Sequence, residues 1–76
     1  MTRETLDNKI QSMLDQIIEI ESMVEKSTRE AIEALKRLDL EAARRIYRND
    51  ELINAKRFEL ENFLMITIAT QQPLMA

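Results

Sequence analysis

The chain has 76 residues, with 11 Lys and Arg against 14 Asp and Glu, and therefore a formal net charge of -3. It contains no cysteine and no histidine, which excludes disulfides, thiolate metal sites and catalytic triads, and we expect no enzyme. It also lacks glycine and has one proline, Pro73, so composition predicts a single all-α unit.

The first residues show no basic end followed by an apolar core, so we predict no signal peptide. The longest apolar run, from Phe63 to Ala69, is far shorter than the roughly 20 residues that span a bilayer. We therefore expect a cytoplasmic protein without membrane insertion.

A periodic apolar seam predicts a first long helix over about residues 3–38. Its members are Leu6, Ile10, Met13, Ile17, Ile20, Val24, Ala31, Ala34 and Leu38. A second row runs beside it, made of Leu14, Ile18, Thr28, Ile32 and Leu35. Two adjacent rows predict two neighbouring helices, as in a bundle.

A turn is expected at Asp39, whose carboxylate can accept hydrogen bonds from the free N–H groups that open the next helix. A second helix is predicted over about residues 40–70. Gln71 and Gln72 should loosen that helix, and Pro73 suits the first position of a third helix at 73–76. The predicted unit is an antiparallel αα-hairpin whose chain stops where a third helix has just begun.

The second helix carries a narrow apolar stripe and ends in a segment that is apolar on all sides. The stripe consists of Ile46, Ile53, Leu60, Leu64 and Thr67. One partner helix cannot cover a segment that is apolar all round. We therefore predict that the hairpin self-associates as a dimer, forming a four-helix bundle.

Polar residues follow the shoulder of this stripe with the same period: Asp50, Asn54, Arg57 and Glu61. The oxygens of Asp50 and Asn54, one turn apart, can both face one hard cation. The same groups can instead form hydrogen bonds across helices and fix their alignment. The sequence leaves both interpretations open.

The run LDLEAARRIYRNDELINAKRFELE, an apolar segment and then QQP resemble the second helix of PhoU-type proteins, which regulate phosphate uptake. The matching pieces are Asp39, Ala42, Ala43, Ile46, Asp50, Asn54, Glu61, Gln72 and Pro73. The first helix, with ESMVEKSTREAIEAL, is similar to the opening helix of that family. The family's third helix and second bundle are not present.

The resemblance implies a cytoplasmic regulator that couples a phosphate ABC transporter to a sensor histidine kinase. Some family members hold iron or zinc clusters on carboxylates. By that resemblance, Asp50, Asn54 and Glu61 match the ligands that the second helix contributes to such a cluster. No cofactor is assigned to this chain itself.

Two other functions stay open. The chain can be a structural homodimerisation hairpin without a ligand, or an RNA-binding four-helix-bundle hairpin. Against RNA binding, the basic residues of the second helix alternate with acidic ones, which is typical of a solvated helix face. The basic residues are Arg44, Arg45, Arg48, Lys56 and Arg57, and the acidic ones are Glu51, Glu59 and Glu61.

Overall fold

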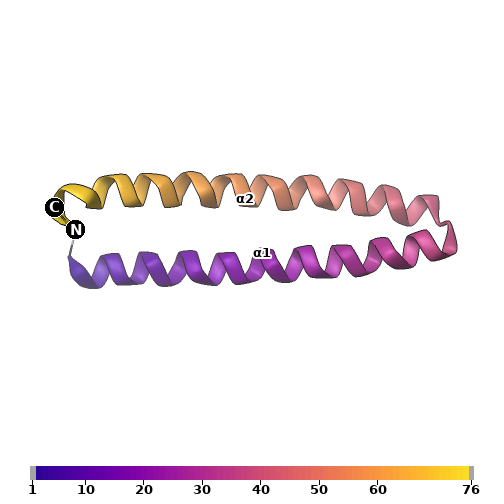
Figure 1. Ribbon diagram of the computed structural model, residues 1–76, viewed down its shortest axis with the longest axis horizontal. Helices are drawn as coiled ribbons and strands as arrows, with labels where there is room; N and C mark the ends of the chain where they lie inside the picture. Colours follow the sequence, from indigo (N-terminus) through magenta and orange to yellow (C-terminus); the bar gives the residue numbers. More distant parts are fainter. Residues whose placement is uncertain (1, 76) are drawn as a thin grey trace.

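The computed structural model describes the backbone of residues 2–75 and the side chains of residues 2–71. Two helices, α1 (Arg3–Arg37) and α2 (Leu40–Met75), lie side by side and run antiparallel (Figure 1). The molecule measures 55 × 16 × 16 Å, about the length of one 36-residue helix. The predicted all-α hairpin is therefore confirmed.

Local hydrogen bonds set the start of α1 and the start of α2. The N–H of Thr5 donates to Oγ1 of Thr2, 3.1 Å away, and so caps the first turn of α1. At the other end of the hairpin, the N–H of Ala42 donates to Oδ1 of Asp39 at 3.0 Å. Asp39 is thus the cap of α2, as its sequence position predicts.

The connection between the helices is only two residues long. Leu38 takes a left-handed backbone conformation, with φ 55° and ψ 41°. Its N–H donates to the carbonyl of Leu35 at 3.2 Å, and the N–H of Asp39 donates to the carbonyl of Ala34 at 2.9 Å. These bonds satisfy carbonyls at the end of α1 and turn the chain back.

The interface between the helices is narrow and holds few large side chains. Ile53 is 0% exposed, and its buried apolar companions are Met13, Ala34 and Leu60. Ser27 and Thr67 are also buried. Ser27 lies between Val24 and Ala31 of the α1 seam, and Thr67 belongs to the predicted α2 stripe. The predicted seam is only partly confirmed, because Leu38 is 84% exposed and Ala31 is also exposed.

The predicted end of the second helix is wrong. α2 continues through Gln71, Gln72 and Pro73 to Met75, so no third helix begins at Pro73 in the described backbone. Pro73 has no N–H to donate to the carbonyl four residues earlier, and a proline ring crowds that turn, so the continuation of α2 through Pro73 runs against the local preference of proline. Ala76 lies outside the described residues.

Candidate functional site

Asp50 and Asn54 form a polar pair on consecutive turns of α2. The amide Nδ2 of Asn54 donates to Oδ2 of Asp50 at 3.4 Å, and both side chains are exposed. This long bond in water leaves carboxylate and amide oxygens accessible. The pair can supply two oxygen ligands to a hard cation.

Glu61 does not join this pair. It follows Asn54 by seven residues and Asp50 by eleven, which places it about 10 and 16 Å further along the helix axis. Among the described residues, no group of three or more Asp, Glu, His or Cys side chains could hold a metal ion. Asp50, Asn54 and Glu61 of one chain therefore do not fit a complete metal site.

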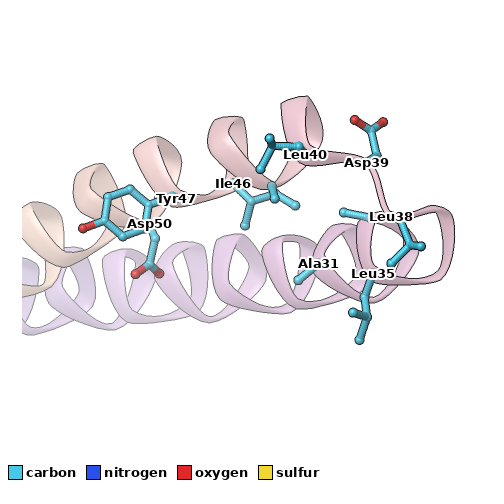
Figure 2. Close-up of a pocket in the computed structure, with 10 residues that line it drawn as sticks. Ala31, Leu35, Leu38, Asp39, Leu40, Ile46, Tyr47 and Asp50 are labelled. Carbon is cyan, nitrogen blue, oxygen red and sulfur yellow. The ribbon is translucent and has the colours of Figure 1, made fainter.

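An open apolar groove of about 530 Å³ lies near the turn, between the two helices (Figure 2). Small side chains contribute to its lining, with larger apolar ones beside them. The lining residues are Ala31, Ala34, Leu35 and Leu38 of α1, Leu40, Ala43, Ile46, Tyr47 and Asp50 of α2, and Asp39 between the helices. In Figure 2 the Asp50 carboxylate projects from α2 over α1, and the Tyr47 ring lies along α2.

The sequence contained part of the signal for this groove. Ala31 and Ala34 were recognisable as a small stretch of the α1 seam, but the role of Leu40 and Tyr47 was missed. The missed signal is Ala43, a second small residue one helical turn before Tyr47. Small residues on both facing helices leave a hollow between the larger side chains beside them.

The groove belongs to a broad exposed apolar surface, which we call the open face. Helical phase places twelve large exposed side chains on this side of the hairpin. They are Ile10, Leu14, Ile18, Val24, Ile32 and Leu35 of α1, and Leu40, Tyr47, Phe58, Leu64, Met65 and Ile68 of α2. The polar pair of Asp50 and Asn54 lies within it, between the groove and the apolar residues nearer the end of α2.

The opposite side of the hairpin is lined mainly by charged residues, and we call it the charged face. Two shallow hollows mark it, one containing Arg29, Glu33 and Arg45, and the other Glu19 and Lys56. Arg29 pairs there with Glu25 one turn earlier on α1. Basic and acidic side chains are interspersed, so this face does not form a basic patch for nucleic acid.

Within the described part of the chain, neither helix is long and apolar enough to cross a membrane.

Comparison with known proteins gives one consistent result. The family model of the PhoU domain matches residues 17–76. A phosphate-specific transport system accessory protein PhoU homolog of Clostridium acetobutylicum is 32% identical over all 76 residues, which cover 35% of that protein. A Burkholderia protein of the same name is 30% identical over 67 residues, 88% of this chain and 28% of its own length. No solved structure matches.

Proposed function

Because the chain belongs to the PhoU family, we propose that it is a regulator of phosphate uptake and phosphate-starvation signalling, or a piece of one. The observation that carries this proposal is the alignment of the whole chain with the Clostridium acetobutylicum protein. The PhoU family consists of regulatory proteins rather than enzymes, which confirms the expectation that the chain is not an enzyme.

The chain spans only about a third of the length of the curated relatives it matches. We propose that residues 1–76 correspond to the first two helices of one three-helix PhoU repeat. Such a hairpin has no enclosed cavity for a substrate among its described residues, and it presents long helical surfaces. Its action is therefore assigned to contacts between helices of different proteins.

The proposed partners are a phosphate ABC transporter and a sensor histidine kinase, which places the chain in the cytoplasm. The open face supports this kind of action. Exposed apolar surfaces of several hundred Å² mark sites of protein association in soluble proteins. Twelve large apolar side chains from both helices contribute to this one.

We also infer that the isolated hairpin self-associates into a four-helix bundle. The fully buried large side chains are few, and Ile53 alone among the described residues is less than 2% exposed. Domains of this size bury little of the surface that the unfolded chain exposes, so they commonly need further contacts for stability. A second hairpin can supply the helices that a larger bundle would provide.

We propose metal binding only at a site whose ligands come from more than one segment or chain. Asp50 and Asn54 would be two ligands of such an ion, and another segment or chain would supply the rest. Glu61 would be a ligand at a different site. Metal analysis of the purified chain and of Asp50→Ala tests this. Iron or zinc that is retained by the chain and lost in the variant supports the shared site, whereas equal metal content in both argues against it.

The regulatory role is tested in bacteria that carry a reporter of the phosphate-starvation response. The chain is produced in a strain lacking its own PhoU protein and in a strain that retains it. We expect repression of the reporter in the first strain, or interference with repression in the second, because a fragment can replace or compete for PhoU contacts. An unchanged reporter in both strains, with folded chain present, would contradict the proposal.

Ile53→Asp provides the control for this experiment. It places a charge at a fully buried position of the hairpin, so the folded helical surface should be lost. An effect on the reporter that survives this substitution would not come from the folded hairpin.

A further inference from the structure

The open face has a shape, size and charge that fit a second copy of the same chain. We propose that two hairpins pack through their open faces in antiparallel orientation, with the turn of one over the chain ends of the other. This inference rests on the proposed self-association, and the second copy would occupy the same open face that the proposed regulatory contacts use.

The exposed area matches what a dimer of this size would bury. The hairpin exposes 6376 Å², whereas a folded monomer of 9.0 kDa typically exposes about 4,900 Å². The excess of roughly 1,500 Å² exceeds the ~800 Å² that each partner buries in a standard interface. The excess over the whole hairpin is therefore large enough for one half of a stable dimer interface, and the exposed apolar side chains of the open face contribute to it.

The two ends of the open face are complementary in side-chain size. Near the turn, Ala31, Ala34 and Ala43 contribute to the groove of about 530 Å³. Near the other end, Leu64, Met65 and Ile68 are exposed on α2. In an antiparallel dimer, these larger side chains of one copy fill the groove of the other copy. The two-fold symmetry produces this contact at both ends of the dimer.

The two halves of the hairpin also differ in charge. The turn half, residues 20–57, has nine basic and eight acidic side chains, a net charge of +1. The terminal half, residues 1–19 and 58–76, has two basic and six acidic side chains, a net charge of -4. An antiparallel pair places unlike halves together, whereas a parallel pair would bring the two -4 halves into contact.

Symmetry then defines the centre of the interface. The two hairpins pack face to face, and the two-fold axis lies between the faces, perpendicular to the long axis of the hairpins. This axis reverses the direction of the hairpin, and it places α2 of one copy over α2 of the other. The axis passes near the middle of α2, where Asn54, Arg57 and Glu61 lie on the open face. Phe58, which is 71% exposed, borders them on the side away from α1, and a large aromatic side chain at an interface is a typical energetic anchor.

Cysteine cross-linking tests the arrangement, because the chain has no cysteine of its own. Tyr47 and Ile68 lie equally far on either side of the midpoint of α2, and both are exposed. Tyr47→Cys and Ile68→Cys are purified separately, mixed under mild oxidation and resolved by mass. We expect the mixed disulfide in large excess over either like-paired disulfide, since a disulfide needs Cα atoms within about 7 Å.

Sedimentation equilibrium of the unmodified chain accompanies this experiment. The expected mass is twice 9.0 kDa, and Phe58→Asp should reduce it to that of the monomer. Leu52→Asp is the matched control, because Leu52 is also exposed but lies toward the charged face with Arg48 and Glu59. It should leave the dimer intact.

The contrary outcomes are distinct. A dimer whose disulfides are like-paired, or that forms no mixed disulfide, would overturn the antiparallel arrangement but not self-association. A chain that sediments as a folded monomer would overturn both, and would assign the open face to a different protein. The reporter assay evaluates the regulatory role separately.

Discussion

Lys56 and Glu19 connect the two helices on the charged face, where Nζ of Lys56 lies 3.7 Å from Oε1 of Glu19. Among the described residues, the other ion pairs join residues three or four apart on the same helix. Lys9 makes a second contact of a cation between helices, with Nζ 5.9 Å from the ring centre of Phe63. These contacts agree with the register that the buried seam imposes.

We expect the pair of Lys56 and Glu19 to contribute little to stability. Both side chains are more than half exposed, and exposed ion pairs contribute about 0.2 to 1 kcal/mol. A double-mutant cycle with Lys56→Ala and Glu19→Ala, followed by urea unfolding, should give a coupling within that range that falls as salt is added. A larger, salt-independent coupling would contradict this prediction.

A charge at Ile53 should have a far greater effect. Ile53 is 0% exposed, so Ile53→Asp places a carboxylate in the apolar interface between the helices. Burial of this charge should cost several kcal/mol of stability. We expect loss of most helicity by circular dichroism and loss of assembly by sedimentation. Leu52→Asp puts the same residue one position earlier, where the side chain is exposed, and should retain the helical spectrum.

Arg48→Ala should also retain the spectrum, because Arg48 is exposed and alanine favours the helix. An Ile53→Asp variant with unaltered helicity would show that the assignment of the buried side of α2 is wrong.

The hairpin was predictable because its signals are local and periodic. Ile53, Leu60 and Thr67 recur every seven residues and are all buried. Asp39 was recognisable as a cap because its side chain reaches backbone N–H groups within its own turn. The two-row pattern of α1 predicts two neighbouring helices. Leu14, Ile32 and Leu35 of the second row are exposed in the hairpin, so the second neighbour stays a prediction.

Other features depend on geometry that the pattern does not contain. Leu64 continues the α2 stripe but is 37% exposed, because a single neighbouring helix covers only part of a broad apolar sector. The continuation of α2 through Pro73 runs against the preference of proline, which removes one helical hydrogen bond, and nothing in the local sequence indicates it. Asp50, Asn54 and Glu61 share a helix flank by periodicity, but their axial separation prevents them from meeting at one ion.

Removal of the cap of α2 should weaken the hairpin. Asp39→Ala deletes the oxygen that accepts the N–H of Ala42 at 3.0 Å, and loss of such a cap costs about 1 kcal/mol. Thermal unfolding should show a lower midpoint. Asp39→Asn retains an oxygen that can accept this bond, so it is the matched control and should stay close to the unmodified chain.

Leu38→Gly should have the opposite effect and stabilise the hairpin. Leu38 has φ 55°, a conformation that costs a residue with a Cβ atom roughly 1 kcal/mol and costs glycine almost nothing. Its side chain is 84% exposed, so its removal sacrifices little burial between the helices. The gain is reduced by the larger conformational entropy of glycine in the unfolded chain.

We therefore expect a modest rise in the urea midpoint for Leu38→Gly, with an unchanged slope. Leu40→Gly supplies the comparison, since Leu40 is exposed to a similar degree but lies in the first turn of α2. Glycine within a helix costs about 1 kcal/mol, so that variant should be less stable than the unmodified chain. If both glycine variants lower the midpoint equally, the left-handed conformation of Leu38 does not determine the stability of the turn.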